Sequence, residues 1–399
     1  MLEAREILVP KNGVREQNRR NTIIEIMVNA DRQVSIANRL GLSAASVSSV
    51  VKELADERIV DDNRDTDRRK GQTVRLSAMR GVALGIDLGF QRTAVIGRRV
   101  DQPFSAISVR RRDEGANRGF ANILGSIREM IAEVVEETGQ VHADIVSAGI
   151  AVPRMIDPRT GRFTAPVLPP WTETDEPAKE LENLLKVRVA IDNDANLGAM
   201  AEQIYGSDEP VETVVYVKAS TGIGAGIMIG NVLLRGDRGM AGEIGHLTID
   251  RDGEVCLCGG RGCLDTIIGA EALLAQVRQA RRRTLHDQPT ALRSLIDQAH
   301  AGDAACRRIL NDAGRTLGLG LAQLCNLINP RLIVLGGELS AGKELVIEPC
   351  AQELRRFALS GAVSSRNEFQ LRLSNLDGLA EAQGALILGL RARQLDAVA

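Results

Sequence analysis

A histidine and three cysteines form the most specific chemical pattern in the sequence, His246-x9-Cys256-x-Cys258-x4-Cys263. Half of the six cysteines fall within eight residues, and glycines stand between them. Glycine lets the backbone turn tightly enough for three thiolates to converge, and the imidazole would complete a tetrahedral Cys3His shell around zinc. With four protein ligands the zinc would be structural and would not activate water. The alternative is that the three thiols are incidental core residues.

A carboxylate lies close to this pattern in the sequence. Glu243 precedes His246 by three residues and stands in a glycine-containing segment, 239–245. A metal bound by His246 would restrain the loop that carries Glu243. We therefore expect the metal to fix how Glu243 is presented to a ligand.

A glycine-rich segment precedes the cysteines. The apolar runs 214–218 and 227–229 flank the segment 220–226, which contains three glycines. A dinucleotide-binding glycine motif must open a helix, whereas a strand-like run follows here. The pattern predicts a hairpin whose turn offers backbone N–H groups to an anion or another ligand. The alternative is a plain glycine-rich hairpin.

Asn193 and Asp194 stand where a strand gives way to a helix that runs from Leu197 towards Ile204. Ligands of α/β sheets bind at the carboxyl ends of the strands. Because a glycine hairpin follows along the chain, Asp194 becomes a candidate base for a sugar hydroxyl. An Asn-Asp pair can also be no more than a helix cap.

The strands that position these groups begin after a boundary near Ser77–Arg80. Residues 82–86 predict a buried strand that leads into Asp87-Leu88-Gly89, and residues 93–97 predict the returning strand. An acidic residue between a strand end and a glycine turn resembles the phosphate approach of the actin and sugar-kinase fold.

The N-terminal residues predict three helices. Asn18–Asn29 is apolar at five positions, and a short helix with Val34, Ile36, Ala37 and Leu40 facing inward follows it. Gly41-Leu42-Ser43 then forms a turn in which Ser43 caps the next helix. That helix places Val47, Val50, Val51 and Leu54 on one face, at the spacing of an amphipathic helix. The layout is that of a helix-turn-helix, whose second helix enters the major groove of DNA.

The expected DNA-contacting surface comprises this second helix and a wing. On the helix it consists of Ser43, Ala44, Ala45, Ser46, Ser48, Ser49 and Lys52. Residues 59–60 and 73–76 predict two short strands around a charged loop, 61–72. Arg68, Arg69 and Lys70 at its tip could reach phosphate or the minor groove. The alternative is a helical protein-interaction domain with a charged loop.

Composition narrows the function classes. The length of 399 residues predicts two or three domains. Aromatic residues make up 2% of the chain, so a sugar would be held by hydrogen bonds and not by stacking platforms. Residues 1–80 hold 15 Lys/Arg against 12 Asp/Glu, while the whole chain carries a net charge of −2. This mildly basic head fits a DNA-contacting module, and an ordinary solvated surface accounts for it equally well.

The sequence predicts a cytoplasmic protein without a membrane partner. Residues 1–14 contain four charges and lack an apolar core stretch, and no 18-residue apolar run follows. The cysteines are therefore expected to be reduced or metal-bound. Cys306, Cys325 and Cys350 stand alone and are expected to be small core residues.

Taken together, these motifs resemble the ROK family of repressors and sugar kinases, and specifically its transcriptional regulators. The resemblance extends from the helix-turn-helix to the C-terminal helix. It rests on the segments Asp87–Gly89, Asn193–Asn196, Thr221–Gly224, Ala241–His246, Cys256–Asp265 and Gly336–Leu339.

The resemblance implies a two-lobed, actin-like (ribonuclease H-like) sugar-kinase fold with a cleft between the lobes. In family kinases the residue matching Asp194 deprotonates the sugar. Residues matching Asn193, Glu243, His246 and Asp265 hold it. His246 would serve the metal and the sugar with one ring nitrogen each.

Four positions depart from the family pattern. Phe90 stands where a bare glycine backbone usually meets phosphate, which argues against ATP binding and kinase activity. Asp265 replaces a glutamate that touches the sugar, and Val167 replaces an asparagine. Arg154 replaces a glycine and brings a cation towards the cleft. These changes indicate a pocket adapted to a modified or charged sugar, or partly lost.

We therefore expect a winged helix-turn-helix over 1–80 and a sugar-kinase-like body over 81–399. One lobe of the body comprises roughly 81–192 with the C-terminal helix, and the other 193–380. The expected function is that of a non-catalytic, homodimeric or homotetrameric repressor of carbohydrate-related genes, which binds operator DNA and a sugar-derived effector. The alternatives are a sugar kinase with a DNA-binding head, in which Asp194 would be catalytic, and a ligand-free dimerisation scaffold.

Overall fold

The computed structural model describes residues 2–8, 13–61, 73–164, 170–172, 174–206, 211–280, 289–364 and 368–392. The chain divides into two compact units. The first comprises Met1–Leu197 with Glu381–Ala399, and the second comprises Gly198–Ala380.

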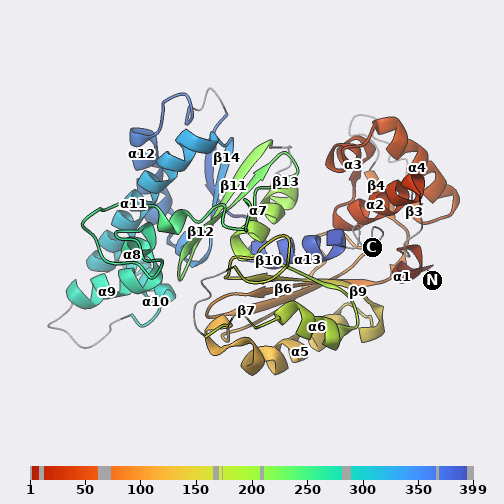
Figure 1. Ribbon diagram of the computed structural model, residues 1–399, viewed down its shortest axis with the longest axis horizontal. Helices are drawn as coiled ribbons and strands as arrows, with labels where there is room; N and C mark the ends of the chain where they lie inside the picture. The colour runs from red at the N-terminus through yellow and green to blue at the C-terminus, as the bar shows by residue number, and fades with distance from the viewer. Residues whose placement is uncertain are drawn as a thin grey trace. The chain divides into compact units, whose positions relative to one another are not determined.

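The first unit begins with three principal helices and a small sheet (Figure 1). The helices are α2 (Val14–Val28), α3 (Gln33–Leu40) and α4 (Ala44–Asp56), after a short β1 (Leu2–Glu3) and α1 (Ala4–Ile7). The sheet has the order β2-β4-β3, formed by Asp31–Arg32, Thr73–Leu76 and Val60–Asp61. β1 pairs in parallel with β5 (Met79–Arg80). This is the element order that a winged helix-turn-helix requires.

The turn between α3 and α4 follows the prediction. Gly41 adopts a left-handed conformation with φ of 65°, and the Ser43 side chain accepts a hydrogen bond from the N–H of Ser46. The four apolar residues predicted for the inner face of α4 are buried. Among the described residues no single helix is long and apolar enough to cross a membrane; only α3 and α4 together, bent by 118°, pass on length and composition.

Two details of the N-terminal helices differ from expectation. α2 begins at Val14 and not at Asn18. The expectation that Val34 faces inward is wrong, because its side chain is 60% exposed. Side chains two positions apart on a helix point in nearly opposite directions, so burial of Ile36 turns Val34 to the solvent.

The first unit also contains a five-stranded sheet in the order β10-β9-β6-β7-β8. Its strands are β6 (Val82–Leu88), β7 (Thr93–Arg99), β8 (Ser108–Arg112), β9 (Ile145–Val152) and β10 (Val189–Asn193). β6, β9 and β10 run parallel, whereas β7 and β8 alternate in direction. α5 (Phe120–Glu137) and α6 (Pro177–Leu185) pack on one face over a shared apolar core.

α13 (Ala380–Ala392) covers the opposite face of this sheet (Figure 1). The helix approaches the strands so closely that a Cβ atom on Gly85 would lie 2.0 Å from the Ala382 carbonyl oxygen. At Gly149 the corresponding distance to the Ala385 oxygen is 1.9 Å. The two glycines, on neighbouring strands, therefore allow α13 to pack closely against the sheet.

The second unit repeats the topology of the first sheet. Its strand order is β13-β12-β11-β14-β15, so the first strand of the set is again central and the fourth and fifth lie beyond it. The strands are Val232–Leu233, Ile223–Ile229, Thr213–Ala219, Leu332–Gly336 and Gln370–Leu373, respectively. Two sheets of this order are the hallmark of the actin-like fold that the sequence predicted.

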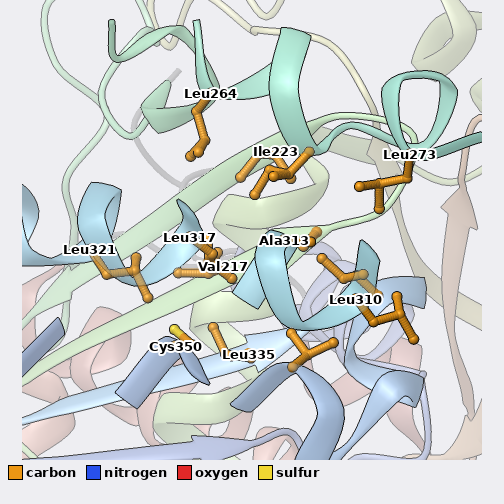
Figure 2. Packing of buried hydrophobic residues seen from close by; sticks show 14 of the residues in the cluster. Val217, Ile223, Leu264, Leu273, Leu310, Ala313, Leu317, Leu321, Leu335 and Cys350 are labelled. Carbon is orange, nitrogen blue, oxygen red and sulfur yellow. The ribbon is translucent and has the colours of Figure 1, made fainter. Parts of the chain in front are cut away.

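The helices of the second unit enclose one apolar core with the sheet (Figure 2). They are α8 (Leu264–Ile268), α9 (Ala270–Ala280), α10 (Leu292–His300), α11 (Ala304–Ile328) and α12 (Glu344–Phe357). α7 (Asp194–Tyr205) packs on the sheet through Gly198, which lies against the ring of Tyr216. As predicted, Cys306, Cys325 and Cys350 are buried. Burial raises the pKa of Cys325 and of Cys350 to about 12.

Candidate metal centre and ligand site

The predicted metal ligands converge in the second unit. One donor atom from each of His246, Cys256, Cys258 and Cys263 lies within 4.8 Å of all the others. Cys256 and Cys263 are buried, whereas Cys258 and His246 reach the surface. Four residues spread over eighteen positions of the chain therefore form one compact donor set.

Two distances within the set match those of a zinc tetrahedron. Zn–S bonds of about 2.3 Å and Zn–N bonds of about 2.05 Å place two sulfurs about 3.8 Å apart, and a sulfur and a nitrogen about 3.6 Å apart. The Cys258 and Cys263 sulfurs are 3.7 Å apart. The Cys256 sulfur lies 3.6 Å from Nδ1 of His246. These two distances fit a zinc ion, and every other pair of donors lies within 4.8 Å.

The protein environment shifts the pKa values of two of the thiols in opposite directions. A hydrogen bond from the Gly260 N–H to the Cys258 sulfur, 3.4 Å long, lowers the pKa of Cys258. Burial and the neighbouring sulfurs raise the pKa of Cys263 to about 12. A divalent cation would favour the thiolate form at every cysteine of the set.

A short loop connects the metal ligands to strand β12. The N–H of Ala225 in β12 donates to the Gly242 carbonyl oxygen at 2.8 Å, and Leu264 donates to Leu247 at 2.9 Å. The loop that carries Glu243 is therefore bonded to the sheet on one side and to the cysteine-rich segment on the other. Gly242 has φ of 90°, and a Cβ atom there would lie 1.8 Å from the Ala225 carbonyl oxygen.

His246 presents its two ring nitrogens to different partners. Nδ1 faces the Cys256 sulfur, and Nε2 lies 4.0 Å from a carboxylate oxygen of Glu243. The side chains of His246 and Glu243 are 36% and 30% exposed. One imidazole can therefore bind a metal through Nδ1 while Nε2, together with Glu243, faces a ligand.

Asp265 links the cysteine-rich segment to the glycine hairpin. Its carboxylate accepts a hydrogen bond of 2.7 Å from the N–H of Ile223. Burial raises the pKa of Asp265, and the Ile223 hydrogen bond and His246 oppose the rise. Gly245 lies directly against this carboxylate, since a Cβ atom there would be 2.6 Å away. Asp265, Glu243 and His246 therefore lie on one locally bonded frame.

The glycine hairpin differs from its prediction in one respect. The turn was expected to span 220–226, but β12 begins at Ile223, so Gly224 and Gly226 lie within the strand. They pair with Lys218 and Tyr216 of β11. The close backbone approach to β12 is made by Gly242, whose Cβ atom would meet the carbonyl oxygen of Ala225 between these two glycines.

Asn193 and Asp194 lie in the first unit, where β10 meets α7. The Asn193 side chain accepts hydrogen bonds from the N–H groups of Ala195 and Asn196, so it caps the helix. Its amide nitrogen donates to the Arg154 carbonyl oxygen at the end of β9. Asp194 is 7% exposed, and its carboxylate accepts the N–H of Ala195. Burial lowers the pKa of Arg154, while the charge of Asp194 opposes this.

The turn after β6 is stabilised through its backbone carbonyls. Gly89 and Phe90 accept hydrogen bonds of 2.9 Å from the N–H groups of Ala116 and Asn117. Arg92 forms an ion pair with Asp113 at 3.0 Å, and both side chains are exposed. Phe90 therefore lies in a turn that is already hydrogen-bonded to the segment behind it.

The residues predicted to contact DNA lie on one exposed surface of α4. Ser43, Ala44, Ala45, Ser46, Ser48, Ser49 and Lys52 are all exposed. Arg68, Arg69 and Lys70 lie outside the described residues, as does Val167. β3 and β4, the strands on either side of 62–72, pair antiparallel, with Val60 opposite Leu76.

One buried charged group was missed by the sequence reasoning. Glu25 of α2 is 2% exposed and forms ion pairs with Arg39 of α3 and Arg391 of α13. Its signal was a carboxylate within the apolar run 23–28, which must be buried with that run. Charged residues are almost never fully buried unless they are paired.

The comparisons with known proteins agree with this architecture. Residues 83–392 match the model of the ROK family. A putative xylose repressor from Caldicellulosiruptor sp. (strain Rt8B.4) is 29% identical over 89% of this chain and 90% of its own length. The structure of a ROK family transcriptional regulator, a homologue of the E. coli MLC protein, aligns with a TM-score of 0.71 at 20% identity. That alignment covers 96% of this chain and 100% of the regulator.

A kinase structure also aligns. The ROK family glucokinase from Streptomyces griseus, in complex with glucose and AMPPNP, has a TM-score of 0.67 and 27% identity. It covers 78% of this chain, and 100% of the glucokinase is aligned. The chain is therefore a sugar-kinase-like protein of the actin-like class. It belongs to the ROK family, and the predicted fold is confirmed.

Proposed function

We propose that this protein is a sugar-responsive, DNA-binding transcriptional repressor of carbohydrate-related genes. The observation that carries the proposal is the exposed, Ser43-capped helix α4, joined in one chain to a ROK body. Similarity to the putative xylose repressor over nearly the full length of both chains supports the same conclusion.

The DNA-binding surface combines α4 with the segment between β3 and β4. Small side chains on α4 let a helix sit deep in the major groove, and Lys52 supplies a phosphate contact. Arg68, Arg69 and Lys70 are proposed to extend this contact along the backbone of DNA. Because α4 offers few groups for bidentate base reading, we expect shape and phosphate contacts to contribute much of the affinity.

The effector is proposed to be a sugar or sugar derivative. In the second unit Glu243, His246 and Asp265 would accept or donate hydrogen bonds to its hydroxyls. Asn193 and Asp194 are proposed as further sugar-binding residues from their match to the family motif. Asn193, Asp194 and Asp265 are positioned by hydrogen bonds to backbone N–H groups, and Nε2 of His246 lies 4.0 Å from the Glu243 carboxylate.

Zinc is proposed to be structural. His246, Cys256, Cys258 and Cys263 would hold it, and their spacing supports a four-coordinate site with no open position. When bound, the ion would stabilise the loop that presents Glu243. Effector binding would then depend on the metal although the metal itself does no chemistry.

We further propose a homodimer or homotetramer that reads a palindromic operator. Closed twofold symmetry in the protein is mirrored by half-sites about one helical turn apart. An effector that changes operator affinity must itself bind differently to the DNA-bound protein, by the same factor.

The test is binding to DNA from upstream of the protein's own gene, measured by fluorescence anisotropy with and without D-xylose, D-glucose and N-acetyl-D-glucosamine. Lys52→Gln is expected to weaken binding and to reduce the salt slope by about one. Lys179→Gln, an exposed lysine on α6, is the matched control and should change neither. A specific footprint that no sugar changes would refute the sensing function and leave a DNA-binding scaffold.

The second candidate is a sugar kinase with a DNA-binding head. The buried Asp194 and the similarity to the glucokinase favour it, whereas Phe90 opposes it. A phosphotransfer assay with ATP, magnesium and a panel of hexoses separates the two. We expect no transfer by the wild type; transfer that is lost in Asp194→Asn would establish the kinase.

A further inference from the structure

Helix α13 makes backbone contact with the helix that begins at Asp194. A Cβ atom on Gly384 would lie 1.9 Å from the carbonyl oxygen of Leu197, so the two backbones are in direct contact and leave no room for a larger side chain. Leu197 follows Asp194 by three residues in α7, which is a rise of about 4.5 Å. A displacement of the first turn of α7 towards α13 would therefore push directly on the α13 backbone.

The other end of α13 is bonded to the helix-turn-helix. Arg391 donates to both carboxylate oxygens of Glu25 on α2, at 2.8 and 3.1 Å. Gly384 and Arg391 are seven residues apart, about 10 Å along a rigid helix. One helix thus contacts the Asp194 segment at one point and the DNA-binding module at the other.

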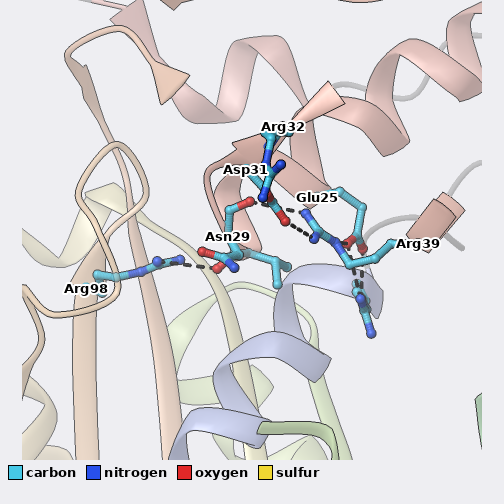
Figure 3. Close-up of polar contacts among 8 residues, drawn as sticks. Glu25, Asn29, Asp31, Arg32, Arg39 and Arg98 are labelled. Carbon is cyan, nitrogen blue, oxygen red and sulfur yellow. Dashed lines mark hydrogen bonds and ion pairs between the residues drawn. The ribbon is translucent and has the colours of Figure 1, made fainter. Parts of the chain in front are cut away.

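Glu25 is also hydrogen-bonded to α3. Arg39 of α3 donates to the Glu25 carboxylate at 3.0 Å and to Asp31 at 2.8 Å (Figure 3). α3 precedes α4 by a three-residue turn, so its position sets that of the DNA-facing helix. Burial acts to raise the pKa of Glu25, but Arg391 and Arg39 together lower it, and the carboxylate stays ionised between them.

A second cation ties α2 to the first sheet. Arg98 of β7 is 1% exposed and donates to the carbonyl oxygens of Met27 and Val28 at the end of α2 (Figure 3). A guanidinium at a helix C-terminus is favoured by the helix dipole. α2 is therefore anchored to the sheet by Arg98 and to α13 by Arg391. These hydrogen bonds and ion pairs are directional, so they restrict sliding of α2 more than apolar contacts would.

We propose that α13 couples the Asp194 segment to the helix-turn-helix, with Gly384 and Arg391 as its two contact points. Arg391 is then a positioning residue for α3 and α4. The proposal rests on the proposed function, because it identifies the route by which an effector at Asp194 would change DNA binding. Packed helices and ion pairs can carry such coupling when the element between the two sites has two arrangements that both sites bias.

The experiment measures amide hydrogen exchange in the full-length protein without DNA or sugar. Arg391→Gln is expected to speed exchange in α3 and α4 about tenfold, since these helices lose one of their anchors. β9 and α11 should keep wild-type rates, which shows that the body is folded. Arg391→Lys, which retains the charge, should restore much of the protection. Arg308→Gln, which breaks an exposed ion pair on α11, is the matched control and should leave α3 and α4 unchanged.

A double-mutant cycle tests the coupling itself. Gly384→Ala forces α13 away from Leu197 and is expected to alter exchange in α3 and α4. Gly125→Ala, in a helix with nothing within 4 Å, should not. In the Gly384→Ala, Arg391→Gln double variant the effect of Gly384→Ala on α3 and α4 should vanish.

Two results would overturn the proposal. One is wild-type exchange in α3 and α4 of Arg391→Gln, and the other is additive effects in the cycle. Neither readout needs an operator or an effector, so failure of the coupling and failure of the proposed function are seen separately.

Discussion

Replacing Gly242 by alanine tests whether the loop between β12 and the metal ligands holds Glu243 and His246 in place. The added Cβ would lie 1.8 Å from the Ala225 carbonyl oxygen, whereas ordinary contacts begin near 3.4 Å. The loop must therefore move by about 1.6 Å, and the hydrogen bond from Ala225 to Gly242 is lost.

The magnitude follows from three contributions. Alanine at a left-handed φ costs about 1–2 kcal/mol. Overpacking adds about 1–3 kcal/mol, and the lost hydrogen bond adds about 0.5–1.5 kcal/mol. Gly230→Ala is the matched control, because Gly230 has φ of 59° in the same unit and nothing lies within 4 Å of its Cβ position. The left-handed cost is common to both variants, so we expect Gly242→Ala to lower the free energy of unfolding by about 1.5–4.5 kcal/mol more than Gly230→Ala.

The assay combines urea unfolding with competition for zinc by a chelator. A loop displaced at Gly242 moves His246, four residues on, so zinc affinity should fall about 10- to 100-fold. Gly230→Ala should keep wild-type zinc affinity. Equal destabilisation by the two variants, together with unchanged zinc affinity in Gly242→Ala, would refute the view that the sheet positions the metal ligands.

Three further outcomes are expected. Ser43→Ala should lower stability by about 1 kcal/mol in urea unfolding because α4 loses its cap, whereas Ser48→Ala, exposed on the same helix, should not. Burial acts to raise the pKa of Glu25, but Arg391 and Arg39 lower it. The stabilisation that the Glu25 carboxylate provides is therefore complete above its unfolded-state pKa of about 4.3, and it is lost as the pH falls through the folded-state pKa. Acid unfolding of Glu25→Gln should accordingly show less pH dependence below about pH 4.3 than that of the wild type. Chelation of zinc should lower the Tm by about 5 °C or more, and an unchanged Tm with metal-free protein would count against a structural ion.

Local features of the fold were predictable because their physical causes are close together in the chain. The cap at Ser43 and the inner face of α4 follow from spacing alone, and both are confirmed. The four metal ligands lie within one short segment, so their convergence could also be expected. The burial of Val34 was predicted wrongly, because hydrophobicity alone does not say which side of a short helix faces the core.

Contacts between distant segments could not be predicted in this way. Glu25 and Arg391 are 366 residues apart, and no periodicity relates them. The sequence shows that a carboxylate in an apolar run needs a cation, but many arginines could supply it. The contact of Gly242 with Ala225 could not be predicted either. A glycine in the sequence indicates that another part of the backbone lies close, but it does not identify that part.

The discontinuity of the first unit has a consequence for biosynthesis. Strands β6 to β10 leave the ribosome early, but α13, which packs on one face of their sheet, is translated after the whole second unit. Gly85 and Gly149 therefore cannot contact α13 until the second unit has been made. Arg391 also reaches Glu25 only at that stage, so the newly made N-terminal helices are not anchored to α13 until the whole second unit has been translated.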